Sequence, residues 1–390
     1  MRTPILQIVH YTDMHIVGPD YRRQRRAVDR IKPLLSSGWQ QGLAGASRDA
    51  LLAFEDFLKT DVAGDADWGS CPIWLLDTGD GTTFGDVSSL EQWLNDWSVR
   101  FLGACGSRGR QLILYGNHDA WPKTHPLIAP RSMQTHRDYL RSTWFTDTYP
   151  RAPLSTGIPG SAGSEIQLFS LNSVVHGLFE NVRALGEVLP DRFWEPTPSG
   201  AGPRGPTAID ELSRLVTSLS TGGAPGVRHL RLIAMHYPVA KDASGAKRLT
   251  EILVNRDAFG REVGSSKFGS PPMFPLFFGG HTHGEFPPLG LLPRSASFAR
   301  HDPLPAPLTQ LVSGSLSQIR LSSGSVAASY AEQLENDYPY RASVFRFSAL
   351  QSNEIAIERI TVGCQVGGAF EMLPIIDGGS ICSEDFVLVI

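Results

Sequence analysis

The stretch Leu112-Ile-Leu-Tyr-Gly-Asn-His-Asp119 decides the fold of this chain. Its first residues are apolar and typical of a buried β-strand, and it ends in an amide, an imidazole and a carboxylate directly behind a glycine. In α/β proteins, functional sites form at the carboxyl ends of strands. The stretch alone predicts only a polar turn after a strand, so its meaning depends on the rest of the chain.

Four other apolar segments end in the same kinds of side chain: Asp13 and His15, then Asp80, then His236, and finally His281 and His283. In Asp13-Met-His15 and His281-Thr-His283 the polar residues are two positions apart, which places both on one side of an extended segment. Imidazole, carboxylate and amide groups without thiolates suit manganese, iron, zinc or nickel. With Asn117 there are seven candidate ligands, which fit two ions sharing one carboxylate at a separation of about 3.5–4 Å.

Composition sets wider limits on the chain. Its 390 residues suffice for one large domain or two ordinary ones, and a net charge of −4 gives no general case for nucleic acid or an anionic membrane as partner. The four cysteines form no Cys-x-x-Cys pair, which predicts a reducing compartment without a thiolate metal site. The start of the chain is unlike a signal peptide, and no run reaches the roughly 18 apolar residues of a membrane span. We therefore expect a cytoplasmic protein.

Hydrophobic periodicity predicts alternating strands and helices. Helices are expected over 48–60, 88–105, 137–145 and 207–220. Strands are expected over 5–9, 71–76, 112–114, 165–171, 230–235 and 275–278. Three late strands, which are expected to close a second sheet, cover 308–313, 343–347 and 354–360.

Taken together, Asp13-Met-His15, Gly79-Asp80, Gly116-Asn-His-Asp119, His236 and Gly280-His-Thr-His283 resemble, in order, the five signature motifs of the calcineurin-like metallophosphoesterases. The resemblance implies a four-layer αββα sandwich of the α/β class, with two mixed β-sheets face to face and helices outside. It implies one domain over residues 1–362, with metal motifs in 13–283 and closing strands in 308–360. The tail, 363–390, is expected to dock on the same domain.

The resemblance also implies a role for each motif residue. Three residues would bind a first metal ion: Asp13, His15 and His283. Three would bind a second ion: Asn117, His236 and His281. Asp80 would bridge the two ions. The expected pair is Mn²⁺ or Fe/Mn, with Zn²⁺ or Ni²⁺ as alternatives.

His118 is expected to act on substrate instead of binding metal. The resemblance implies that it stabilises a phosphoryl oxygen and protonates the leaving group, and that Asp119 orients it. A water bridging two divalent ions loses its proton near neutral pH and attacks phosphorus, so hydrolysis of a phosphate ester is expected. His176 follows another predicted strand and is a candidate substrate contact, with a core or surface histidine as the alternative.

Departures from individual branches of the family narrow the substrate class. Thr83 stands where purple acid phosphatases carry a tyrosine ligand, and the Gly-Asp-Tyr-Val-Asp-Arg-Gly motif of protein phosphatases is absent. Asp119 stands where 5′-nucleotidases usually carry glutamate, and His118 stands where lipid-A-pathway pyrophosphatases carry arginine. What remains resembles the bacterial phosphodiesterase-like branch, so a phosphodiester is the favoured substrate.

Other functions stay open at this point. They are a phosphomonoesterase or protein phosphatase, a nuclease that serves a larger assembly, and a non-catalytic metal-binding scaffold. His236-Tyr-Pro238 only partly matches the His-Pro-Pro of cyclic-nucleotide enzymes, so cyclic nucleotides, nucleotides and nucleic acids are all candidate substrates. The loops 184–206, 241–275 and 284–307 are long enough to dock a partner, but their composition identifies none.

Overall fold

The structure is a computed structural model of the whole chain. The residues that it describes are 2–18, 46–83, 87–114, 116, 118–119, 153–171, 215, 218–219, 229–236, 276–281, 309–317, 337–351, 354–373, 375–377, 380–382 and 384–389.

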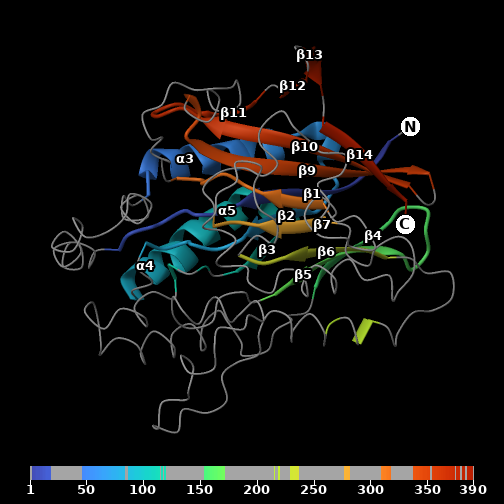
Figure 1. Cartoon of the computed structure of the whole chain (residues 1–390), viewed down its shortest axis with the longest axis horizontal. Helices are drawn as coiled ribbons and strands as arrows, with labels where there is room; N and C mark the ends of the chain where they lie inside the picture. The colour runs from blue at the N-terminus through green and yellow to red at the C-terminus, as the bar shows by residue number, and fades with distance from the viewer. Residues whose placement is uncertain are drawn as a thin grey trace, which may run out of the picture.

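The larger sheet is mixed and has seven strands in the order β11-β10-β9-β1-β2-β3, with β14 also paired to β10. Its strands are β1 (Thr3–Tyr11), β2 (Ile73–Asp77), β3 (Gly109–Ile113), β9 (Tyr340–Gln351), β10 (Glu354–Cys364), β11 (Phe370–Met372) and β14 (Glu384–Val389). The first three strands run parallel to one another, and β9 joins β1 on its other side in antiparallel register. The N-terminal strand therefore lies between the second strand and a strand from near the C-terminus (Figure 1).

The smaller sheet has five strands in chain order. They are β4 (Leu154–Gly157), β5 (Glu165–Ser170), β6 (His229–Ala234), β7 (Leu276–Gly279) and β8 (Thr309–Val312). The first pair is antiparallel, and the other pairs are parallel. A separate antiparallel pair is formed by β12 (Ile375–Asp377) and β13 (Ser380–Cys382).

The late strands differ from the sequence-based expectation. Of the three, only β8 joins the second sheet, whereas β9 and β10 extend the first. The physical reason is the free edge of β1, whose backbone groups opposite β2 need partners and find them in β9. Farther along, β14 pairs with β10 over six residues, so the end of the described chain is part of the same sheet.

Helices cover one face of the larger sheet. They are α3 (Arg48–Phe57), η2 (Leu58–Val62), η3 (Ala66–Trp68), α4 (Val87–Glu91), η4 (Gln92–Trp97), α5 (Ser98–Ala104) and η5 (Gly106–Arg108). The first helix begins where Ser47 caps it by accepting a hydrogen bond from the Ala50 amide. Leu51, Phe54 and Leu58 follow at helical spacing and are buried against the sheet. None of the described helices is long and apolar enough to cross a membrane.

Alternate residues of the larger sheet enter two different cores. Val9 and Leu75 pack with the helices, whereas Ile8 and Leu76 pack against side chains of the smaller sheet, among them Leu232. The two sheets therefore lie face to face. Of the other predicted helices, 137–145 lies outside the described residues, and only positions 215, 218 and 219 of 207–220 are described, all helical. The predicted α/β class, with two mixed sheets flanked by helices, is confirmed.

Candidate metal centre

Four residues with ligand side chains have a left-handed backbone. Asp13, His15 and Asp80 have φ angles of 54°, 53° and 53°, and His281 has a φ of 74°. In the part of the chain that the structure describes, no other non-glycine residue has a positive φ. This conformation costs about 1–2 kcal/mol per residue, and such outliers concentrate at functional sites. All four follow the carboxyl ends of β1, β2 and β7.

The chain leaving β1 runs beside the chain leaving β2. Three amides within residues 13–16 donate to the carbonyls of residues 79–81, with N···O distances of 2.8 to 3.0 Å. Gly79, with a φ of 102°, makes the turn that brings Asp80 to this edge. The pairing continues the parallel register of the two strands and brings Asp13, His15 and Asp80 to one place.

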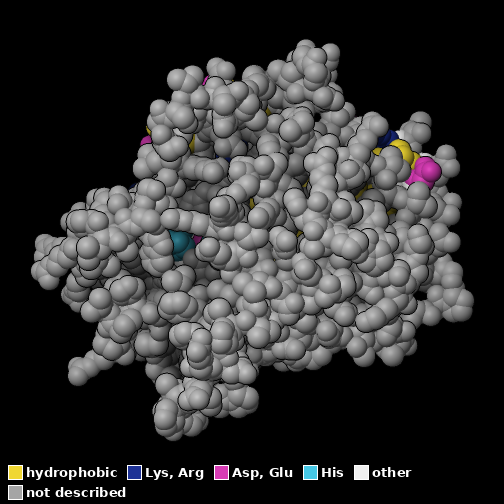
Figure 2. All heavy atoms as spheres, in the orientation of Figure 1, with side chains coloured by type: hydrophobic (Ala, Val, Ile, Leu, Met, Phe, Trp, Pro, Cys, Tyr) yellow, Lys and Arg dark blue, Asp and Glu magenta, His cyan; other side chains and the backbone are white. Residues whose placement is uncertain are grey.

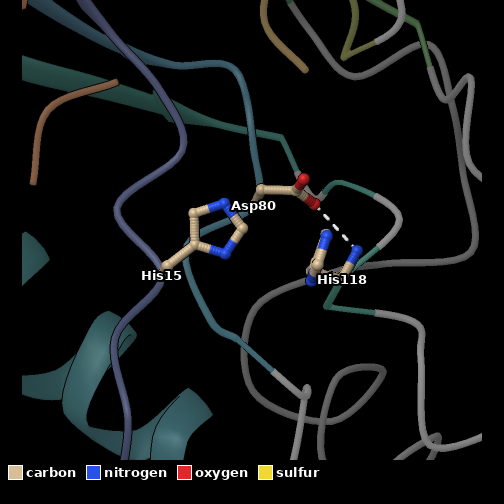
Figure 3. Close-up of side chains that lie close together, drawn as sticks. All are labelled: His15, Asp80 and His118. Atoms are coloured by element: carbon tan, nitrogen blue, oxygen red, sulfur yellow. Dashed lines mark hydrogen bonds between the residues drawn. The ribbon is translucent and has the colours of Figure 1, made fainter. Parts of the chain in front are cut away.

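Gly116 lets the third strand end approach Asp80 closely. A Cβ atom at this position would lie 2.1 Å from Asp80 Oδ1 and 2.6 Å from Cε1 of His236. The glycine of the Gly-Asn-His-Asp stretch is therefore required by the space that the carboxylate and the imidazole occupy. Two residues later, the His118 amide donates to Asp80 Oδ1 at 2.8 Å, as the dashed line in Figure 3 shows.

Two groups of potential ligands share Asp80. His15, Asp80 and His118 each offer a ligand atom, and these atoms lie within 4.8 Å of one another (Figure 3). Asp80, His236 and His281 form a second group by the same measure. One carboxylate between two sets of imidazoles is the arrangement expected for two ions with a bridging ligand.

Asp13 links the two groups. Its Oδ1 lies 3.9 Å from Nε2 of His15, and its Oδ2 accepts a hydrogen bond from the His281 amide at 3.1 Å. Asp13 and His15 are fully buried, and His281 is partly buried. The β1 and β7 strand ends therefore meet at this carboxylate.

A main-chain carbonyl orients His236. Its Nδ1 donates to the Thr78 carbonyl at 2.8 Å, which leaves Nε2 facing Asp80 Oδ2 at 3.5 Å. Carbonyl partners of this kind fix the orientation of imidazole ligands in metal sites. Burial opposes the imidazolium form, but the Asp80 and Asp13 carboxylates outweigh it and raise the pKa of His236 to about 9. Conversely, burial opposes ionisation of Asp80, while His236, His118 and His15 together hold the pKa of Asp80 well below its ordinary value.

His118 is oriented by a different group from the one expected. Its Nδ1 donates to the Thr83 carbonyl at 3.0 Å, and its ring meets the His15 ring edge to face, with centroids 4.7 Å apart. The carboxylate of Asp119 instead accepts four hydrogen bonds from elsewhere: the amides of Gly116, Gly81 and Thr82, and the Thr82 hydroxyl. Asp119 thus ties the third strand end to the loop behind Asp80, and its expected contact with the His118 ring is not formed.

Burial also affects the carboxylates behind the site. Burial and the neighbouring Asp80 raise the pKa of Asp119 to about 7, against its hydrogen bonds from Gly116 and Thr82. Asp77, fully buried at the end of β2, accepts hydrogen bonds from the Gly79 amide at 3.0 Å and from Trp93 Nε1 at 2.9 Å. These bonds brace the turn that carries Asp80 against helix η4.

The donor set fits transition-metal ions. Asp80 Oδ2 is buried and accepts no hydrogen bond of good geometry from the described residues, and imidazoles lie around it. A buried carboxylate oxygen in that position suits a cation, and mixed imidazole and carboxylate donors suit Mn, Fe or Zn. In the space-filling view, a histidine and an acidic side chain are visible at the floor of a hollow (Figure 2).

The structure therefore brings five of the seven predicted ligands together: Asp13, His15, Asp80, His236 and His281. Asn117, His283 and the candidate substrate contact His176 lie outside the described residues. Sequence reasoning missed the carbonyls of Thr78 and Thr83, because every residue has a carbonyl and residue type carries no signal for it.

Comparison with known proteins adds little. No family model matches the chain, and no curated protein matches it. Among solved structures, it is similar to a Staphylococcus aureus protein provisionally assigned as a 5′-nucleotidase, crystallised with α-ketoglutarate. The TM-score is 0.38 at 10% identity, over 95% of this chain and 54% of the other. The chain thus spans about half the length of that protein.

Proposed function

We propose that this chain is a metal-dependent phosphoester hydrolase of the calcineurin-like metallophosphoesterase class, with two metal ions bound around Asp80. The observation that carries the proposal is that Asp80 is shared by two groups of potential ligands, one containing His15 and the other containing His236 and His281. The left-handed backbone of Asp13, His15 and Asp80 supports it, because strain at these positions persists only where function or surroundings require it.

The two ions would be held by the two sides of the cluster. On one side, Asp13 and His15 would bind the first ion, with His283 as a further proposed ligand. On the other, His236 and His281 would bind the second, with Asn117 as a further proposed ligand. Bound there, the ions would supply Lewis acidity and a water of lowered pKa.

Charge favours a phosphate at this place. Asp13 and Asp80 are the carboxylates that reach the cluster from the strand ends, and together they carry a charge of −2. The imidazoles are neutral when they bind metal, so a loaded centre has a surplus of positive charge. Such a centre attracts an anionic ester and offsets negative charge that develops on phosphoryl oxygens during hydrolysis.

The orientation of His118 suits a proton donor to the leaving group. Because its Nδ1–H is held by the Thr83 carbonyl, Nε2 is the ring atom left to carry a transferable proton. The ring stands beside His15 at the edge of the cluster and is partly exposed, so substrate can reach it. General acids in such positions act within hydrogen-bond reach of the leaving oxygen.

Within this class we favour a phosphodiester as substrate, on the sequence departures around Thr83 and Asp119. The test is a panel of esters with Mn²⁺-loaded protein: bis-(p-nitrophenyl) phosphate, p-nitrophenyl phosphate, a cyclic nucleotide, a 5′-nucleotide and single-stranded DNA. We expect turnover of the diesters, abolished in Asp80→Asn. Turnover confined to monoesters would overturn the diester preference, and bound metal without turnover of any ester would identify a non-catalytic scaffold.

A further inference from the structure

The segment Ser313-Gly-Ser-Leu-Ser317 follows β8 and lies against the chain that leaves β1. Its three serines are all buried, and each donates a hydrogen bond to a main-chain carbonyl. Ser313 Oγ donates to the carbonyl of His10 at 3.3 Å, and Ser315 Oγ to that of Asp13 at 2.7 Å. Ser317 Oγ donates to the carbonyl of Met14. Ser315 and Ser317, which we term the serine ladder, lie about 300 residues farther along the chain than the carbonyls that they contact.

The serine ladder completes the hydrogen bonding of the turn at residues 12–16. Within the turn, the Thr12 carbonyl accepts from the Leu316 amide at 3.0 Å. Thr83 provides the remaining donors, its hydroxyl to the carbonyl of residue 15 at 2.8 Å and its amide to that of residue 16 at 3.1 Å. Together with Ser315 and Ser317, these donors give each carbonyl from residue 12 to residue 16 a partner outside the turn.

This turn contains two left-handed residues separated by one. Asp13 has a φ of 54° and His15 a φ of 53°, and neither is a glycine. Side chains of these types rarely adopt such angles, which persist only where the surroundings specify them. The amides of the turn are tied to the β2 loop, and the serine hydroxyls hold two of its carbonyls on the other side. The two sets of bonds fix the peptide planes on which the directions of the Asp13 and His15 side chains depend.

The serine ladder itself is firmly anchored. The Arg341 amide donates to the Ser315 carbonyl at 2.9 Å, and the Ser47 amide, at the cap of α3, donates to the Ser317 carbonyl at 2.8 Å. The Arg341 side chain fills the space beside Gly314, where an added Cβ would lie 2.7 Å from Nε. Hydroxyls on a segment held by β9 and α3 can impose a geometry on the turn that they contact.

We propose that Ser315 and Ser317 are positioning residues of the metal centre, whose hydroxyls select the left-handed turn that directs Asp13 and His15 toward Asp80. The inference rests on the proposed function and deepens it. It attributes the placement of Asp13 and His15, the proposed ligands of the first ion, to side chains outside the metal motifs. Partners one step removed from a metal ligand typically change metal affinity by about 10- to 100-fold. We expect loss of either hydroxyl to lower the affinity for one of the two ions by a factor in this range.

The test is calorimetric titration of the metal-free full chain with Mn²⁺, for wild type, Ser315→Ala and Ser317→Ala. Ser313→Ala is the matched control, since it removes an equally buried hydroxyl that bonds the carbonyl of His10, before the turn. We expect either ladder variant to weaken one binding event about 10- to 100-fold and to leave the other unchanged. The control should bind both ions as wild type does.

Two further readouts separate positioning from stability. Urea midpoints of the metal-free proteins show whether Ser315→Ala and Ser313→Ala are equally destabilised, and absorption spectra of the Co²⁺-loaded proteins report ligand geometry. We expect similar midpoints and a changed spectrum only for the ladder variants. Ladder variants that bind both ions with wild-type affinity and spectrum overturn the inference. A wild-type chain that binds no Mn²⁺ overturns the proposed function instead, and the inference with it.

Discussion

The Nδ1 atom of His118 lies 3.0 Å from the carbonyl oxygen of Thr83, and because a carbonyl only accepts, Nδ1 is the ring nitrogen that donates a hydrogen in this contact. A carbonyl accepts a hydrogen bond from Nδ1–H whether or not the ring is protonated, whereas a carboxylate would also stabilise the imidazolium form. The ring is thereby oriented without an added negative charge beside it. Its remaining nitrogen, Nε2, is the atom on which the proposed acid role depends.

The first prediction concerns this nitrogen. His118→Asn keeps a donor near the place of Nδ1 but removes the atom at Nε2. We expect kcat for esters with poor leaving groups to fall about 10²- to 10⁴-fold, the usual size of general-acid catalysis. The loss should be far smaller for p-nitrophenyl esters, because their leaving group needs no proton. Steady-state kinetics on both ester types, with metal content measured in parallel, checks this. An equal loss on both would indicate that His118 acts on metal binding or on the phosphoryl oxygens.

The second prediction concerns Asp119, which accepts four hydrogen bonds from residues 81, 82 and 116. Asp119→Ala leaves buried donors without their acceptor, and each buried donor left unsatisfied costs about 1–3 kcal/mol. We expect the free energy of unfolding to fall by about 3 kcal/mol or more, as measured by urea denaturation in EDTA. An unchanged stability with a lower kcat would instead restore the catalytic role that the sequence suggested.

The third prediction uses two glycines that differ in their surroundings. Gly116→Ala places a Cβ atom 2.1 Å from Asp80 Oδ1, so the bridging carboxylate must move. We expect Mn²⁺ affinity to fall at least about 10-fold, as for other displaced supports of a metal ligand, and stability to fall by about 1–3 kcal/mol. Gly103→Ala in α5, where an added Cβ meets nothing within 4 Å, is the control. It should leave metal binding intact and be neutral or slightly stabilising. Unchanged Mn²⁺ titrations for both variants would contradict the close packing around Asp80.

The sequence predicted much of the centre because its side chains have recognisable types. Asp13, His15, Asp80, His236 and His281 each follow an apolar run, and parallel strands bring such ends to one edge. Amphipathic spacing likewise predicted the helices that cover the larger sheet. These features are local, so a reading of nearby residues suffices to find them.

The features that the sequence could not predict depend on contacts between residues far apart in the chain, or on backbone conformation. Ser315 contacts Asp13 across 302 positions, and no local pattern marks it. The placement of β9 beside β1 is a similar long-range pairing. The left-handed angles at Asp13 and His15 run against the preferences of both residue types, because tertiary hydrogen bonds outweigh those preferences.

The last prediction is a pH dependence of stability that originates at His10. This side chain is fully buried in β1, with Nε2 3.1 Å from the Thr78 hydroxyl and its ring edge against Phe278. Burial, assisted by the positive charge of Arg359, lowers the pKa of His10 from 6.5 to about 3. Below pH 6.5, His10 of the unfolded chain therefore binds a proton, whereas His10 of the folded chain stays unprotonated down to about pH 3.

Because the unfolded state binds more protons in this window, acidification must favour unfolding there. The free energy of unfolding should fall by about 1.4 kcal/mol for each pH unit below 6.5, which is about 2 kcal/mol by pH 5. In His10→Gln this contribution is absent, so the difference in stability between wild type and variant should change with that slope. Urea titrations in EDTA from pH 7.5 to 5 would measure it, and a difference independent of pH would show that His10 has the same pKa in the folded and unfolded chain.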